Sequence, residues 1–245
     1  MIKKSIPFLA FFLIIFYLLM NTPLISDEFC WIASARNSSF KDLLNPKNLL
    51  RQNIAGSWFI IAPIEYYLLF IWCHFFNIYN VFIISLIKVF YISLSFYLIT
   101  KFFSTFLDKQ NTFLASLLFI FFPSHDATVF SYMGIYSTLT ISFYLYSFYL
   151  AYNNKLIKAF SFALISSFTS YVSVPMSALS LFFFLNKESK KGLVILIPNI
   201  IYSFYYILLS RIMAVTKTQI PQVLNLHAIM KQFALQIFTF IDSML

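Results

Sequence analysis

The feature that most limits the fold of this chain is a series of apolar segments about as long as a membrane is thick. A helix needs ~20 mostly apolar residues to cross a ~30 Å hydrocarbon layer. Segments of this kind recur along the sequence, for example at residues 5–25, 78–100 and 192–210. Hydrophobic residues make up 61% of the chain and charged residues only 10%, which excludes an ordinary soluble domain. We therefore expect an all-α, polytopic membrane bundle.

The basic residues predict how the chain is oriented in this membrane. The net charge is +9, and Lys and Arg gather in short clusters beside the apolar segments. Such clusters are the usual signal of cytoplasmic loops in a bacterial inner (cytoplasmic) membrane protein, and they argue against nucleic acid as a partner. The rule places Lys3 and Lys4 in the cytoplasm, together with the clusters at 101–109, 155–158 and 187–191. Residues 5–25 are then an uncleaved anchor that crosses outward.

The basic clusters also limit how many times residues 57–100 can cross the membrane. Residues 57–76 and 78–100 are both long enough to cross, but two crossings there would put the 101–109 cluster outside. The earlier segment contains Pro63 and Glu65 and is rich in Trp and Tyr, which favour the membrane interface. We therefore expect residues 57–76 to lie along the outer interface and residues 78–100 to be the second crossing.

The later segments complete the predicted topology. Residues 112–122 leave and 135–152 return, with an outer loop at 123–134 between them. The stretch 158–187 begins and ends beside cytoplasmic Lys clusters, so we expect two short helices broken near Ser170 to Pro175. Residues 192–210 leave again. This gives about seven spans in one transmembrane domain, residues 1–245, and the apolar pattern near Leu245 predicts that a longer protein would continue.

A large outer loop, residues 26–77, begins with Asp27 and Glu28, a pair that holds a quarter of the eight acidic residues in the chain. Asp126 reaches the same face from the 123–134 loop, so two spans each deliver a carboxylate there. Carboxylates at a membrane surface can act as a general base or bind a divalent cation. A polar helix end explains Asp27 and Glu28 equally simply, and His125 is as well explained by an ordinary loop histidine.

Two further features need an explanation. Lys88 lies near the middle of the 78–100 span, where a lone ammonium costs ~2.5 to 3.5 kcal/mol on insertion scales. An ion pair with Glu65 and a contact with substrate both remain open for it. Cys30 and Cys73 show no metal-ligand spacing, and a disulfide between them requires that both face an oxidising compartment.

The order of these segments resembles the N-terminal module of the GT-C superfamily, integral membrane glycosyltransferases that use polyprenyl-phosphate sugars. The resemblance rests on Ser26-Asp27-Glu28 after the first span and on two juxtamembrane helices, at about 38–50 and 57–76. The segment WFIIAPIEYYLLFIWCHFFNIYN is similar to one of the family's segments, and FIFFPSHDATVFSYMGIYSTLTISFYLYSFYLAY is similar to the second outer loop and the span after it. The match covers most of the chain, through short motifs.

The resemblance implies a function and a set of site residues. It implies transfer of a sugar from a polyprenyl-phosphate donor to an acceptor on the outer face, with Asp27 as the general base. Glu28 and Asp126 would bind the acceptor or a divalent cation. The departing lipid phosphate would be neutralised by Arg36, Arg51 or Arg211. A further expected substrate contact is His125.

Two other functions fit the same sequence. One is a catalytically inert GT-C relative that serves as a partner membrane subunit of a longer transferase. The other is a component of a lipid-linked saccharide transporter, which would carry charges along a path through the bilayer. Lys88 is the one mid-span charge in the predicted topology, and the other charges lie at the faces.

Overall fold

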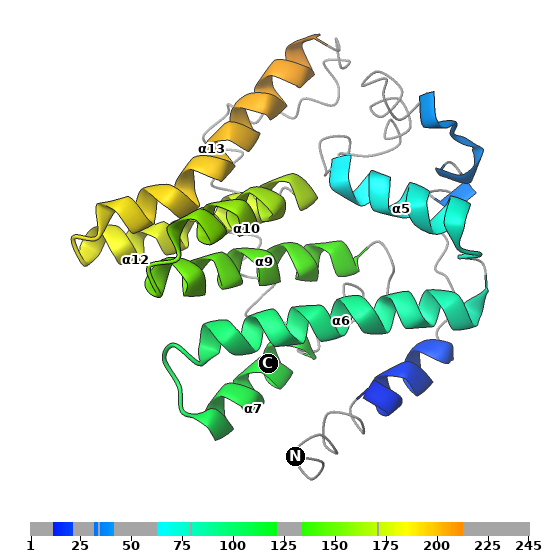
Figure 1. Ribbon diagram of the computed structural model, residues 1–245, viewed down its shortest axis with the longest axis horizontal. Helices are drawn as coiled ribbons and strands as arrows, with labels where there is room; N and C mark the ends of the chain where they lie inside the picture. Colours follow the sequence, from blue (N-terminus) through cyan, green and yellow to red (C-terminus); the bar gives the residue numbers. More distant parts are fainter. Residues whose placement is uncertain are drawn as a thin grey trace, which may run out of the picture. The chain divides into compact units, whose positions relative to one another are not determined.

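The computed structural model describes residues 12–21, 32–33, 35–41, 63–78, 80–121, 134–170 and 172–212, and every structural statement below concerns these residues. All regular elements among them are helices, which confirms the all-α prediction. The chain divides into two compact units, Met1–Ser203 and Phe204–Leu245. The fold and the site described below belong to the first unit (Figure 1).

The longest helix that lies wholly in this unit is α6, Val81–Phe103, with 23 residues. Its first turn is capped by the side chain of Asn80, which accepts a hydrogen bond from the N–H of Phe82 at 2.9 Å. At ~1.5 Å per residue α6 is about 34 Å long, and it is the one described helix that is long and apolar enough to cross a membrane. It corresponds to the predicted second crossing at 78–100.

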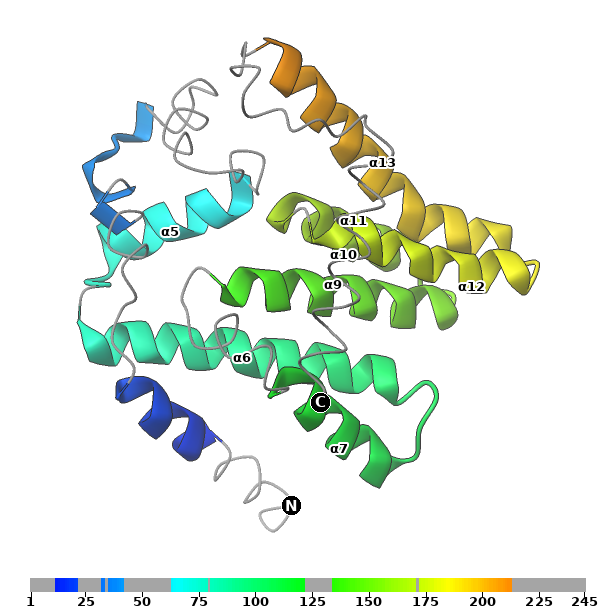
Figure 2. The ribbon, with the colours of Figure 1, turned by 180° about the vertical axis from the view of Figure 1, so that it is seen from behind.

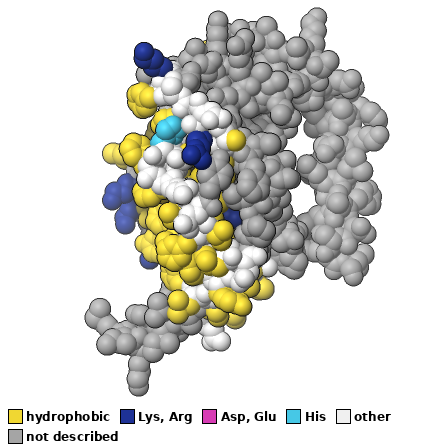
Figure 3. Space-filling view, turned by 90° about the vertical axis from the view of Figure 1, so that its right-hand side faces the viewer, with side chains coloured by type: hydrophobic (Ala, Val, Ile, Leu, Met, Phe, Trp, Pro, Cys, Tyr) yellow, Lys and Arg dark blue, Asp and Glu magenta, His cyan; other side chains and the backbone are white. Residues whose placement is uncertain are grey.

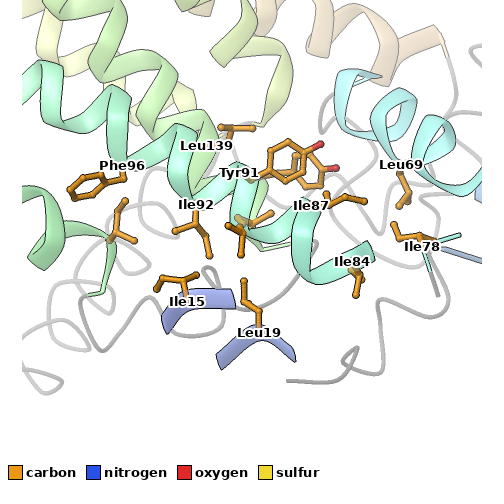
Figure 4. Packing of buried hydrophobic residues seen from close by; sticks show 14 of the residues in the cluster. Ile15, Leu19, Leu69, Ile78, Ile84, Ile87, Tyr91, Ile92, Phe96 and Leu139 are labelled. Atoms are coloured by element: carbon orange, nitrogen blue, oxygen red, sulfur yellow. The ribbon is translucent and has the colours of Figure 1, made fainter. Parts of the chain in front are cut away.

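Helix α6 has two distinct faces. Large apolar side chains on one face are exposed, namely Phe82, Leu86, Phe90 and Tyr97. The opposite face is buried in the main apolar cluster (Figure 4), where Ile15 and Leu19 of the N-terminal helical residues 12–20 approach it from one side and Leu139 from another. A helix with an apolar exposed face suits a lipid environment, since water would not favour that face.

Helix α9, Ile135–Tyr152, packs against α6 on one side and α10, Leu156–Thr169, on the other. Small residues recur every four positions along α10, at Ala159, Ala163 and Ser167, and all three are buried. Such spacing lets two helix backbones approach closely. The hydroxyl of Ser166 also donates to the backbone O of Thr140 on α9 at 2.8 Å.

The remaining elements of the described part are also helices (Figures 1 and 2). They are α5 (Pro63–Phe75), α7 (Lys109–Ile120), α11 (Ser173–Met176), η2 (Ser177–Leu179), α12 (Ser180–Leu185) and α13 (Ser189–Ile212). Helix α7 packs against α6, where the Thr100 hydroxyl donates to Ser116 Oγ at 3.1 Å. Helix α5, which has 13 described residues, lies in the segment 57–76 that was predicted to follow the interface.

Three turns gather at one end of the first unit, which we call the basic end: 104–108, 153–155 and 186–188. Aromatic side chains join them, because the ring of Phe106 lies 6.0 Å from Phe148 and 6.1 Å from Phe182. Both views show the three turns together (Figures 1 and 2). The three Lys clusters predicted to share one side of the membrane therefore lie at one end of the fold.

Two of these turns use a left-handed residue that is not glycine. Asn154 has φ 59° and Lys187 has φ 61°. In each case the next N–H closes back on the preceding helix, from Lys155 to Leu150 O at 2.9 Å and from Glu188 to Phe183 O at 2.8 Å. These are helix C-terminal caps of the kind that usually favours glycine.

The predicted break in the 158–187 stretch is confirmed, but its cause differs from the one expected. Helix α10 ends at Thr169, and Ser170 is extended, with φ −160° and ψ 151°. Helix α11 begins at Ser173, so Val174, the residue before Pro175, is helical. Pro175 lies in the first helical turn, where a missing N–H is tolerated. The break is made at Ser170 and not by the proline.

Candidate functional site

Most of the residues predicted to form the site lie outside the described part of the chain. These are Asp27, Glu28, Arg51, His125 and Asp126. Arg211 lies in the last turn of α13, not in the loop expected to follow it, and its side chain is not described. Arg36 is therefore the one predicted site residue whose surroundings can be examined.

Arg36 lies in a short helical segment that packs against α5. Its neighbours Ile32 and Ala35 are buried in the main apolar cluster with Leu69 of α5, and Arg36 itself is exposed. The Cys73 thiol donates to the backbone O of Ile32 at 3.7 Å, which ties the segment to the end of α5. Figure 3 views this region from the right-hand side of Figure 1 and shows separate Lys or Arg side chains and a histidine among hydrophobic ones.

The pKa of the Cys73 thiol depends on its burial and on the nearby charge of Arg36. Burial raises the pKa of Cys73 to about 11, because the thiolate would lose its hydration, and the positive charge of Arg36 opposes this rise. The guanidinium of Arg36 is therefore close enough to act on a group at the end of α5.

A second candidate lies on the buried face of α6. Lys88 is only 1% exposed, and Ser85, one turn before it, is completely buried. Ser95 is buried on the same face two turns later, because positions three and seven residues apart share one side of a helix. The hydroxyls of Ser85 and Ser95 have no hydrogen-bond partner in the described structure.

Lys88 faces away from the exposed apolar stripe of Phe82, Leu86 and Phe90 and toward the interior of the unit. Ser85 precedes Lys88 by one turn on the same side of α6, so both side chains start from the buried face. Glu65, the ion-pair partner considered from the sequence, belongs to α5, but its side chain lies outside the described part.

Aromatic residues connect α5 to the Lys88 face. Trp72 Nε1 donates to the hydroxyl of Tyr91 at 2.7 Å, and Tyr91 stands one turn beyond Lys88 on α6. The Tyr91 ring lies 5.5 Å from that of Tyr136 at the start of α9. The middle of α6, the end of α5 and the beginning of α9 are thus held together on the face of α6 that buries Lys88.

The carboxylates whose side chains are described have structural roles at the basic end. Asp108 caps α7, and the N–H of Asn111 is the main reason that the pKa of this carboxyl falls below its ordinary value. Glu188 pairs with Lys191 at 2.7 Å. No group of three His, Cys, Asp or Glu side chains in the described ranges could hold a metal ion, and Glu28 and Asp126, the expected metal ligands, lie outside those ranges.

A separate buried polar group joins α10, α11 and α13. Asn199 Oδ1 accepts from the hydroxyls of Ser167 at 2.7 Å and Ser173 at 2.9 Å, and its Nδ2 donates to the backbone O of Ser173 at 2.9 Å. Nearby, the Tyr144 hydroxyl donates to Ile195 O at 2.9 Å, close to Pro198, whose missing N–H interrupts the bonding of α13. We call Asn199, Ser167 and Ser173 the Asn199 cluster.

The sequence reasoning missed the Asn199 cluster and the two unpartnered serines. The signal for the serines was present, since Ser85 and Ser95 stand three before and seven after Lys88, on its side of the helix. The Asn199 cluster joins three separate helices, so sequence spacing could not have revealed it. A scan against protein-family models, a search of curated proteins and a search of solved structures return no match to this chain.

Proposed function

We propose that the chain is a membrane glycosyltransferase-like protein that transfers a sugar from a polyprenyl-phosphate donor to an acceptor on the outer face of a bacterial inner membrane. A polytopic arrangement with a cytoplasmic N-terminus, which the sequence predicts as about seven spans, is part of this proposal. The observation that carries it is the buried Lys88 on α6, next to the unpartnered hydroxyl of Ser85. A cation with neutral hydroxyl donors is suited to an anionic group such as a phosphate ester.

The packing around the acidic pair supports the same proposal. Asp27 and Glu28 stand in sequence between Leu19 and Ile32, and both of these anchors are buried in the apolar cluster that contains Ile84 of α6. The residues that flank this segment on both sides therefore belong to the same apolar cluster as Ile84.

In the proposed reaction each group has a distinct role. The Asp27 carboxylate removes the proton from the acceptor hydroxyl as that oxygen bonds to the anomeric carbon. The bond from this carbon to the phosphate oxygen breaks, and the polyprenyl phosphate leaves with its negative charge. Lys88 and Arg36 stabilise that charge. Such electrostatic stabilisation of a developing charge lowers the activation barrier most where water is excluded. Arg51 and Arg211 are further candidates for the same role, while Glu28, Asp126 and His125 contact the acceptor or a divalent cation.

Binding and transfer have to be measured separately to test this. The full chain is placed in phosphatidylethanolamine–phosphatidylglycerol vesicles with a radiolabelled polyprenyl phosphate for binding and polyprenyl-phosphate sugars for transfer. Lys88→Met removes the ammonium, and loss of a charged hydrogen bond of ~1.5 to 3 kcal/mol predicts roughly ten- to hundredfold weaker binding. Lys101→Met on the same helix, at the basic end, is the matched control and leaves binding unchanged.

Substitution of the predicted general base, Asp27, distinguishes an active transferase from a catalytically inert relative. Asp27→Asn keeps the shape and polarity of the side chain but not its basicity, so transfer falls by roughly 10² to 10⁴ while binding persists. Binding without transfer in the wild-type chain would show an inert relative or partner subunit. Wild-type binding that is indifferent to Lys88→Met would refute the role given to Lys88, and loss of transfer in Asp126→Asn but not Asp27→Asn would reassign the base.

A further inference from the structure

The hairpin formed by α10 and by the helical stretch Ser173–Leu185 has two unusually short arms. Helix α10 has 14 residues, about 21 Å at ~1.5 Å per residue, and the returning arm is of similar length. The hydrocarbon layer is ~30 Å thick, and α6 at about 34 Å is long enough to cross it. Both arms leave from the basic end, at Lys155 and at Lys187. Each arm is therefore about a third shorter than a crossing requires.

Hydrogen bonds to α13 show how far the hairpin reaches. Ser173, at the start of the returning arm, is bonded to Asn199, which stands about 15 Å along α13 from its first residue, Ser189. That first residue belongs to the basic end, where Lys191 Nζ donates to Tyr152 O at 3.5 Å. The closed end of the hairpin thus lies about half a membrane thickness from the basic end.

Helix α9 gives a second and independent measure of depth. Ser166, near the end of α10, donates to the backbone O of Thr140. Thr140 lies about 18 Å from Tyr152, the last residue of α9 at the basic end. Measured along α13 and along α9, the closed end of the hairpin therefore lies about 15 to 18 Å from the basic end.

The polar groups at this closed end are buried in protein. Ser167, Ser170 and Ser173 are each at most 2% exposed, and Asn199 is 3% exposed. Irregular backbone at membrane depth is stable only where protein or water satisfies its polar groups. A loop that emerged into water on the far side would have no need of such partners. The Asn199 cluster supplies them here.

We propose that residues 156–185 form a re-entrant hairpin, which enters and leaves the membrane at the basic end and whose closed end is held inside the membrane by Asn199. This replaces two of the seven predicted spans with a hairpin and keeps every Lys cluster on its predicted side. It also places an Asn and several hydroxyls near the centre of the bilayer. The inference rests on the membrane location in the proposed function but not on sugar transfer.

Spin labels measure these depths directly. Single cysteines replace Val174 near the closed end and Ile157 and Leu185 near the open end, in a full chain that carries Cys30→Ser and Cys73→Ser. These three side chains are 37%, 86% and 83% exposed, so each position accepts a label. In phosphatidylethanolamine–phosphatidylglycerol vesicles, the relative collision rates with oxygen and with a water-soluble nickel chelate give the depth of each label.

We expect the label at 174 to lie near the bilayer centre and the labels at 157 and 185 to lie shallow, on one side. A label at 174 as shallow as the other two would overturn the hairpin and indicate two full crossings, with the proposed function intact. Free access of the nickel chelate to all three positions would overturn the membrane location, and with it the proposed function.

The role of Asn199 is tested in the same experiment. Asn199→Leu removes all three hydrogen bonds of the cluster, and Ser173→Ala removes only one hydroxyl. The label at 174 should become more mobile and shift in depth, more in Asn199→Leu than in Ser173→Ala. Ser161→Ala on the exposed side of α10 should change neither property. An unchanged label at 174 in Asn199→Leu would show that this residue does not hold the hairpin.

Discussion

The hydrogen bond between Ser167 and Asn199 allows a quantitative test of how the Asn199 cluster stabilises the fold. The two side chains are buried and 2.7 Å apart, and they come from α10 and α13. Side-chain hydrogen bonds between membrane helices average ~0.6 kcal/mol in double-mutant cycles, with a maximum near ~1.7. Asn199→Leu breaks three such bonds, so the free energy of unfolding should fall by roughly 2 kcal/mol.

A double-mutant cycle isolates the single contact. Ser167→Ala, Asn199→Leu and the double variant are unfolded reversibly in mixed micelles of a mild detergent and sodium dodecyl sulfate, and helical circular dichroism follows the transition. We expect a coupling energy of about 0.6 to 1.7 kcal/mol. The loss in Ser167→Ala is smaller when Asn199 is already absent, because its partner oxygen has gone.

The matched control is Ser161→Ala on the same helix. Ser161 is exposed, and its hydroxyl bonds to Ile157 O in its own helix, so its effect should add to that of Asn199→Leu within ~0.3 to 0.5 kcal/mol. A Ser167–Asn199 coupling as small as the control would refute the view that this bond links the hairpin to α13.

Three further predictions concern other parts of the chain. In a Cys30→Ser background, alkylation of Cys73 should be slow at pH 7 and become faster as the pH approaches about 11, because burial raises the pKa of the thiol. Arg36→Gln should move this pH profile to still higher pH, because the positive charge of Arg36 lowers that pKa. A profile centred on an ordinary thiol pKa would contradict the prediction. Lys187→Gly should stabilise by up to about 1 kcal/mol in the same micelle assay because φ is 61° there, whereas Lys190→Gly, in the first turn of α13, should give no stabilisation. Ala163→Leu should separate α9 from α10 and destabilise by ~1 to 3 kcal/mol, while Leu164→Ile should have less effect, as the same transitions will show.

The sequence predicted the helical class, the segment that became α6, the grouping of the three Lys clusters and the break after α10. These follow from local signals, because apolar length and charge position are set along the chain. The cause assigned to the break was wrong, since Ser170 and not Pro175 interrupts the helix. The Asn199 cluster could not be predicted, because its members meet only after three helices have packed. Of the predicted site, Arg36 alone can be compared with the structure, and its exposure beside α5 is compatible with the proposed role.

The aromatic contacts at the basic end carry a consequence for how the protein is made. Phe148 on α9 is 1% exposed because the rings of Phe102 at 5.4 Å and of Phe183 at 4.7 Å lie on it. The first of these neighbours is synthesised before Phe148 and the second after it. At ~5 to 20 residues per second, the ribosome needs roughly 2 to 7 s to reach Phe183. During that interval the ring of Phe148 lacks its contact with Phe183. Substitutions at Phe183 should therefore expose the nascent chain to quality-control proteases, and reduce the yield of protein more than the stability of the molecules that are completed.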